Sequence, residues 1–101
     1  MGNSVDNSGN ARKAAETLAA QAFSWVADDE DRLNAFIAMT GAAPADIVRN
    51  ANSAAFLGTV LDYILTEDQL VIAFCDSCRL PYTAPMQARG LLPGGQSWNW
   101  T

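Results

Sequence analysis

The sequence predicts an all-α fold, a compact orthogonal bundle of five or six short helices with an extended C-terminal tail. Apolar residues between positions 53 and 78 recur at three- and four-residue steps, the spacing that places side chains on one face of a helix. No segment of useful length alternates apolar and polar residues, as a half-buried strand would. Because half of the 101 residues are apolar, we expect one domain with one core.

The chain divides into three parts. Residues 1–10 are polar and turn-forming, so we expect them to be disordered. A helical domain follows over residues 11–95, and its first helix is predicted over 11–27. The apolar face of that helix is expected to carry Ala15, Leu18, Ala22, Trp25 and Val26. The remaining residues, 96–101, have no helical pattern and form the extended tail.

The second helix is predicted to begin at Asp28 or Asp29, because either carboxylate can accept hydrogen bonds from the free amides of a helix start. Acidic residues in its first turn suit the positive end of the helix dipole. Gly41 is expected to end the helix in the left-handed conformation that glycine adopts without strain. Its buried face is expected to carry Leu33, Phe36 and Ile37.

The third and fourth helices follow closely. Pro44 suits the first turn of a short third helix, in which Ile47 and Val48 are expected to point inward. Ser53 is predicted to cap the fourth helix. The apolar face of the fourth helix is expected to carry Phe56, Leu57, Val60, Leu61, Ile64 and Leu65.

The fifth helix is predicted to start at Thr66, with Gln69 completing a capping box, and to end before Pro81. A last short helix is expected to begin near Pro85 and to run to about Arg89. The helices are expected to share one core made of Leu18, Trp25, Leu33, Phe36, Phe56, Leu57, Val60, Leu61, Ile64, Leu70 and Phe74.

The chain contains a faint internal echo. Asp29 and Glu30 precede Phe36 just as Glu67 and Asp68 precede Phe74, with a constant offset of 38 residues. A duplicated helix–turn–helix unit is one interpretation. The other is that acidic caps followed by an aromatic core residue recur in any small helical protein.

Composition argues against several classes of function. Histidine, the commonest general base and metal ligand, is absent, and no phosphate-binding or nucleophile motif occurs. We therefore expect no enzyme, no cofactor and no metal site. The net charge of -5 opposes nucleic-acid binding, and the apolar runs are too short to cross a membrane. Because the first ten residues do not resemble a signal peptide, we expect a cytoplasmic protein.

Two alternatives from other classes remain open. The segment from Leu33 to Asn50 has the layout of a DNA-binding helix-turn-helix, which would make the protein a transcriptional regulator. However, it offers only Arg49 and Asn50 as contacts, and the acidic run at 28–31 would repel phosphates. We therefore expect no nucleic-acid partner.

Cys75 and Cys78 are candidate thiols for the other alternative, a thiol redox protein. Reactive pairs usually sit at the start of a helix, where free amides lower the thiol pKa. These two cysteines fall at the end of the fifth helix, which disfavours a thiolate. Two cysteines also supply too few ligands for a zinc site. We expect buried or half-buried reduced thiols without metal.

The candidate interaction residues are Trp98 and Trp100 in the tail and Leu92 at the end of the helical domain. Large aromatic side chains are costly to leave exposed and dominate interface hot spots. We therefore expect the tail to pack against this chain or a second copy of it. The predicted function is a protein-binding or adaptor module, which could be a homodimer.

The order of several motifs resembles a known family. They are the alanine-rich stretch from Ala14 to Phe23, Thr40-Gly41, Pro44-Ala45-Asp46-Ile47-Val48-Arg49, Val60-Leu61-Asp62-Tyr63-Ile64-Leu65, Ala84-Pro85-Met86, and the ending Leu92-Pro93-Gly94-Gly95 with Trp100-Thr101. Over residues 11–101 the chain resembles the alphaproteobacterial domain of unknown function family 3572. The resemblance implies a cytoplasmic bacterial protein without assigned activity or cofactor. The chain departs from the family pattern at Ala43, where a capping acid is expected, and at Arg79, where glycine is expected.

Overall fold

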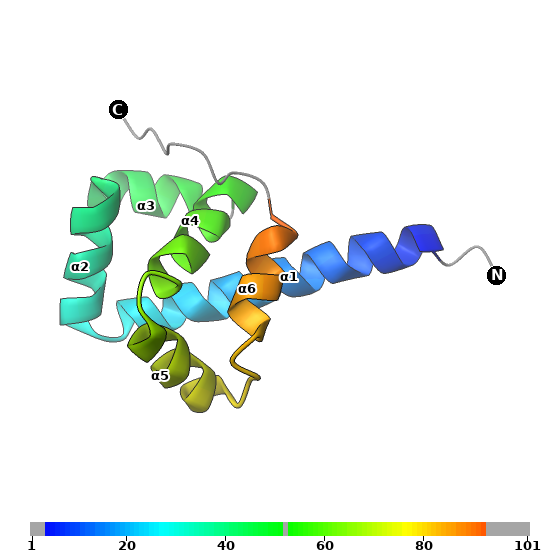
Figure 1. Ribbon diagram of the computed structural model, residues 1–101. Helices are drawn as coiled ribbons and strands as arrows, with labels where there is room; N and C mark the ends of the chain where they lie inside the picture. Colours follow the sequence, from blue (N-terminus) through cyan, green and yellow to red (C-terminus); the bar gives the residue numbers. More distant parts are fainter. Residues whose placement is uncertain (1–3, 52, 93–101) are drawn as a thin grey trace.

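Six helices make up the described part of the chain, residues 4–51 and 53–92 of a computed structural model (Figure 1). They are α1 (Ser4–Ala27), α2 (Glu30–Thr40), α3 (Pro44–Asn50), α4 (Ala54–Ile64), α5 (Asp68–Cys78) and α6 (Ala84–Gly90). No strand occurs among these residues, which confirms the predicted all-α class.

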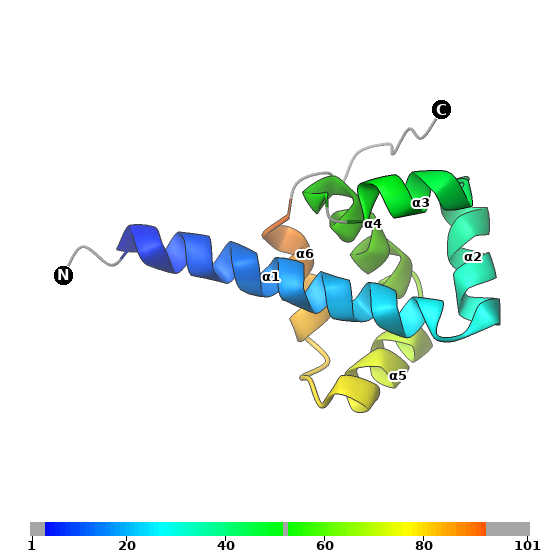
Figure 2. The same ribbon diagram turned by 180° about the vertical axis from the view of Figure 1, so that it is seen from behind.

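The first helix is longer than the sequence predicts. It begins at Ser4 rather than near Ala11, so it includes residues 4–10, which the sequence assigns to a separate N-terminal segment. A helix that is already nucleated extends by one hydrogen bond per residue, and this lowers the need for favourable side chains in its first turns. These turns project beyond the other helices, away from α2 and α3 (Figures 1 and 2).

Most predicted helix ends are confirmed. The Asp29 carboxylate accepts hydrogen bonds from the backbone N–H groups of Asp31 and Arg32, at 2.8 and 3.1 Å. Gly41 ends α2 with a φ of 71°. The Ser53 hydroxyl accepts a bond from the Phe56 N–H at 3.0 Å, which satisfies one free amide of α4.

The predicted cap of α5 is wrong. Glu67 precedes the helix and no side chain caps it, whereas the Thr66 hydroxyl donates to the Tyr63 carbonyl at 2.7 Å. The last carbonyls of α4 lack helical partners, and the neighbouring Thr66 hydroxyl satisfies one of them. Thr66 thus closes α4 instead of opening α5.

The core has buried members from all six helices. Phe36 and Phe56 are fully buried and pack edge-to-face with each other and with Phe23. Of the predicted core, Phe36, Phe56, Leu57, Val60, Leu61, Ile64 and Phe74 are buried, while Leu18, Trp25, Leu33 and Leu70 are half-buried and packed against them.

The prediction for α3 is half right. Ile47 is buried, but the side chain of Val48 is 80% exposed. Successive residues of a helix point about 100° apart, and a helix as short as α3 turns only one side towards the core. Val48 therefore faces outward.

An ion pair holds α6 against α4. The Arg89 guanidinium donates to both carboxylate oxygens of Asp62, at 2.6 and 3.3 Å, and to the Leu92 carbonyl at 3.2 Å. Arginine and carboxylate match each other geometrically in such a two-bond pair, which fixes orientation as well as distance. This contact links α6 to α4, beside the buried Pro85 and Ala88 of α6.

Candidate functional site

An apolar groove runs between the end of α4, the outer face of α5 and the start of α6. Its volume is 340 Å³, and it is lined by Leu65, Asp68, Val71, Ile72, Tyr82 and Met86. Three of the lining side chains are large, apolar and exposed: Ile72 at 43%, Tyr82 at 53% and Met86 at 62%. Exposed apolar side chains gathered around one hollow are typical of a binding surface.

The local sequence explains how the groove walls are placed. On α5, Asp68 and Ile72 are four residues apart and therefore share the outer face of the helix. The turn after α5 is tight, because the Leu80 N–H donates to the Cys75 carbonyl at 2.8 Å. The Tyr82 hydroxyl then reaches back to the Asp76 carboxylate at 2.7 Å. These two bonds hold Tyr82 beside α5 and across from Met86.

The electrostatics of the groove are acidic. Asp68 and Asp76 are exposed on α5, and neither of them forms an ion pair with any residue in the described part of the chain. The hydrogen bond that Tyr82 donates to Asp76, together with the charge of that carboxylate, raises the pKa of the tyrosine. Tyr82 therefore stays a neutral hydrogen-bond donor at physiological pH.

The second hollow of note lies between α1 and α6. Its volume is 260 Å³, and its lining is mostly alanine with Leu18, Gln87 and Leu91. Of its lining residues, Leu91 is the one large apolar side chain that is exposed, at 47%. The α5/α6 groove offers more exposed apolar side chains and is the stronger candidate.

The two cysteines are placed as the sequence predicts. Cys75 is fully buried and Cys78 half-buried, and both are free thiols. The Cys75 sulfur lies 3.4 Å from the Pro81 carbonyl, to which it donates a weak hydrogen bond. Burial, with a smaller contribution from Asp76, raises the pKa of the Cys75 thiol. A buried thiol with a raised pKa is a poor nucleophile.

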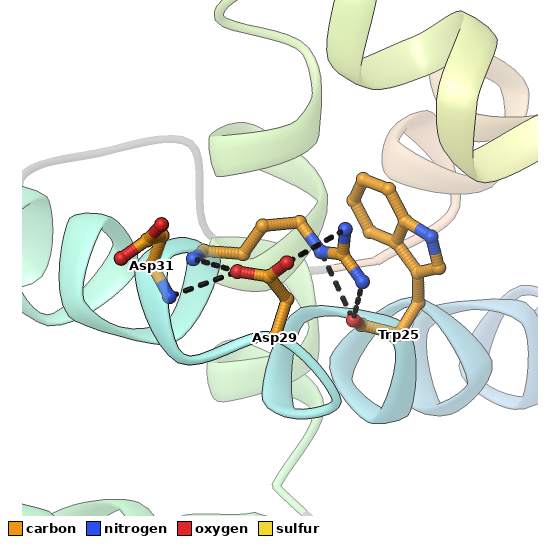
Figure 3. Close-up of polar contacts among 4 residues, drawn as sticks. Trp25, Asp29 and Asp31 are labelled. Atoms are coloured by element: carbon orange, nitrogen blue, oxygen red, sulfur yellow. Dashed lines mark hydrogen bonds and ion pairs between the residues drawn. The ribbon is translucent and has the colours of Figure 1, made fainter.

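Arg32 joins a polar cluster with Trp25, Asp29 and Asp31 (Figure 3). Its guanidinium donates twice to the Trp25 carbonyl, at 3.1 and 2.8 Å, and stacks over the Trp25 ring at 3.8 Å. It also pairs with Asp29 at 3.7 Å. The carbonyl belongs to the last turn of α1, so the cluster ties the end of α1 to the start of α2.

The helix-turn-helix segment uses its polar groups internally. Arg49 pairs with Asp46 at 3.7 Å, and the Asn50 amide donates to the Asp46 carbonyl at 2.8 Å. Both residues that the sequence offers as base contacts therefore already have partners within α3. The exposed Val48 adds no group that could recognise a phosphate.

The candidate interaction residues are only partly within the described chain. Trp98 and Trp100 lie outside the described residues. Leu92, the last described residue, is 7% exposed and belongs to the core. Leu92 thus anchors the end of the domain.

Neither a metal centre nor a membrane-spanning helix is found in the described part of the chain. Among the side chains that the structure describes, no three acidic or cysteine groups gather closely enough to hold a metal ion. Within the same residues, no helix combines the length and the apolar character that crossing a membrane requires.

Sequence reasoning missed the groove. Its residues come from three separate segments, and no motif links them. One signal was present: Ile72 is apolar but stands between Asp68 and Asp76, at four-residue steps on the polar side of α5. A large apolar residue within a polar helix face marks a surface that a partner can cover.

The described residues form a small all-helical domain with an exposed apolar groove between α4, α5 and α6. The chain belongs to the family described as "Protein of unknown function (DUF3572)", whose model matches residues 12–95. This match confirms the resemblance seen in the motifs. No curated protein and no solved structure matches the chain.

Proposed function

We propose that the protein is a binding module that recognises a segment of another protein through the α5/α6 groove. The observation that carries the proposal is the grouping of Ile72, Tyr82 and Met86, all substantially exposed, around one hollow. Tyrosine and methionine are enriched in interfaces, since tyrosine combines an apolar ring with a donor and methionine adapts its shape. An adaptor role fits a domain whose other polar clusters serve its own fold.

The proposal is tested by removing the apolar character of the groove in the full chain. Met86→Asp introduces a charge at the most exposed wall of the groove, and Val48→Asp makes the same kind of change on α3. Each tagged variant is used to capture proteins from a host lysate, and quantitative mass spectrometry compares the captured proteins with those of the parent. Circular dichroism checks that both variants stay folded.

We expect at least one protein to be captured by the parent and by Val48→Asp but to fall at least about tenfold with Met86→Asp, as loss of an interface hot spot implies. Equal capture by both variants would contradict the proposal. Light scattering distinguishes a homodimer, because the partner is then a second copy and Met86→Asp converts a dimer to a monomer.

A further inference from the structure

Asp68 on α5 lines the groove, and Asp76, on the same helix, accepts a hydrogen bond from the lining residue Tyr82. Asp68 and Asp76 are eight residues apart on this helix, which separates them by about 12 Å along its axis. Ile72 stands midway between them. The groove thus has one carboxylate in its lining and a second beside its lining residue Tyr82.

Neither carboxylate is neutralised within the described chain. Asp29, Asp46 and Asp62 each pair with an arginine. Asp68 and Asp76 form no ion pair with the described residues. Asp76 accepts the Tyr82 hydroxyl on one oxygen, and this neutral donor leaves its charge in place.

The arginines nearest to the groove do not neutralise its carboxylates. Arg89 is on α6 but turns to Asp62. Arg79 follows α5 and lies more than 4 Å from both Asp68 and Asp76, since it forms no ion pair with either. Glu67, exposed beside Asp68, adds a further negative charge there. The groove therefore lacks cations, and a partner can supply them.

We infer that the groove takes a basic amphipathic helix, with two lysine or arginine side chains seven or eight residues apart and large apolar side chains between them. This spacing reproduces the distance of about 12 Å between Asp68 and Asp76. The apolar side chains at the intervening three- and four-residue steps contact Ile72, Tyr82 and Met86. The inference rests on the proposed function and adds the chemistry of the partner.

Charge complementarity contributes mainly to the choice between basic and acidic partners. Exposed ion pairs contribute little to affinity individually, but a like charge placed against Asp68 or Asp76 is repelled. Anionic partners, nucleic acids and acidic lipid surfaces among them, are disfavoured by the same two carboxylates. The apolar contacts supply affinity, and the two carboxylates reject the wrong partner.

The test uses the full chain and three synthetic helical peptides of equal length. The first carries leucine anchors flanked by lysines seven residues apart, and the second has glutamates in place of those lysines. The third keeps the lysines but replaces the anchors with alanine. Dissociation constants come from calorimetry, and methyl NMR signals of Ile72 and Met86 report whether the peptide lies in the groove.

We expect the lysine-flanked leucine peptide to bind at least about tenfold more tightly than either of the others. Asp68→Asn and Asp76→Asn should each weaken it by about two- to fivefold, with a smaller dependence on salt. Glu30→Gln is the matched control, an acidic residue in the first turn of α2, and should leave the affinity unchanged.

The inference is overturned if the glutamate-flanked peptide binds as tightly as the lysine-flanked one. It is also overturned if Asp68→Asn and Asp76→Asn change the affinity no more than Glu30→Gln does. Asparagine at position 76 can still accept the Tyr82 hydroxyl, so this variant tests charge without removing that bond. The capture experiment separates the two claims. If Met86→Asp lowers the capture of a protein from the lysate while the peptide test fails, the proposed function stands and the inference about the partner's chemistry is rejected.

Discussion

Helices α2 and α5 share one plan, but only α2 is secured at both ends. Each has 11 residues, and they start 38 residues apart in the sequence. Each buries a phenylalanine completely at the corresponding position, Phe36 in α2 and Phe74 in α5. The constant offset that the sequence shows is thus matched by helices of equal length.

The helix ends differ. Asp29 caps α2 through two backbone N–H groups, whereas the longer side chain of Glu67 makes no cap bond to α5. Gly41 and Arg79 both adopt the left-handed conformation, with φ values of 71° and 59°. Glycine does so without strain, whereas arginine carries a Cβ that crowds the backbone. The glycine that the sequence leads us to expect at position 79 would therefore suit the backbone there.

The two helices therefore differ in what they contribute: α2 secures the fold, and α5 forms one side of the groove. α2 has a capped start, a glycine end and a ring cluster. α5 presents Ile72 outward, with two carboxylates that form no ion pair with the described residues. Binding surfaces are commonly drawn from the less stable parts of a fold. The four predictions below concern matched positions of these two helices.

Replacing the buried phenylalanines should have the largest effect. Phe36 contacts the rings of Phe23, Phe56 and Tyr63, whereas Phe74 contacts the ring of Trp25. Each substitution by alanine should lower the free energy of unfolding by about 3–5 kcal/mol, with Phe36→Ala at the upper end because it loses more ring contacts. Urea unfolding measures both. A loss below about 1 kcal/mol for Phe74→Ala would show that α5 does not depend on its buried ring.

Replacing the residues at the two helix starts should have the next largest effect on stability. Asp29→Ala removes two bonds to free amides and should cost about 1 kcal/mol in urea unfolding. Glu67→Ala should change the free energy by less than about 0.5 kcal/mol, because no cap bond is lost. Glu67→Asp places a shorter carboxylate at the same site and should stabilise the protein by up to about 1 kcal/mol. Equal costs for the two alanine variants would contradict the difference between the caps.

Arg79→Gly should stabilise the protein. Relief of the left-handed strain, about 1–2 kcal/mol, exceeds the added flexibility of glycine in the unfolded chain, about 0.5–1 kcal/mol. The expected net gain is about 0.5–1 kcal/mol. Gly41→Ala is the opposite change on α2 and should destabilise. Thermal unfolding of both variants decides the matter, and a lower melting temperature for Arg79→Gly would refute the expectation.

The smallest expected effect depends on pH. Cys75 corresponds to Ile37 of α2, which does not titrate. Burial raises the pKa of the Cys75 thiol, so the folded state holds this proton more tightly than the unfolded state does. Its contribution is complete below the ordinary thiol pKa and is lost as the pH rises through the raised value. Between neutral and alkaline pH, the parent should therefore lose more stability in urea than Cys75→Val does. Identical pH profiles would argue against this.

The sequence predicts the helices and the core well because both follow from periodic spacing. The caps at Asp29, Gly41 and Ser53 are confirmed, since each depends on a single residue and its immediate neighbours. The predictions for Val48 and Thr66 are wrong. The way α3 packs on the core turns Val48 outward, and the end of α4 takes the hydroxyl of Thr66. These are the cases in which local preference competes with the rest of the fold.

The groove could not be predicted for a related reason. It depends on the path of the turn after α5. The bond between Tyr82 and Asp76 holds this turn against α5, and the pairing of Arg89 with Asp62 links the following helix, α6, to α4. Residues that are far apart in sequence meet there without a shared motif. The candidate residues Trp98 and Trp100 were singled out by residue type alone, and they lie outside the described chain.

The projecting start of α1 should determine how the spectroscopic signal changes with temperature before the protein unfolds. Residues 10–14 of this helix are exposed and Ala15 is buried in the core, so the backbone of residues 10–14 depends mostly on its own hydrogen bonds. Such turns open singly from the free end, without the cooperative loss of the core. Far-ultraviolet ellipticity should therefore decline gradually on warming before the main transition, and amide exchange should slow progressively from Ser4 towards Val26.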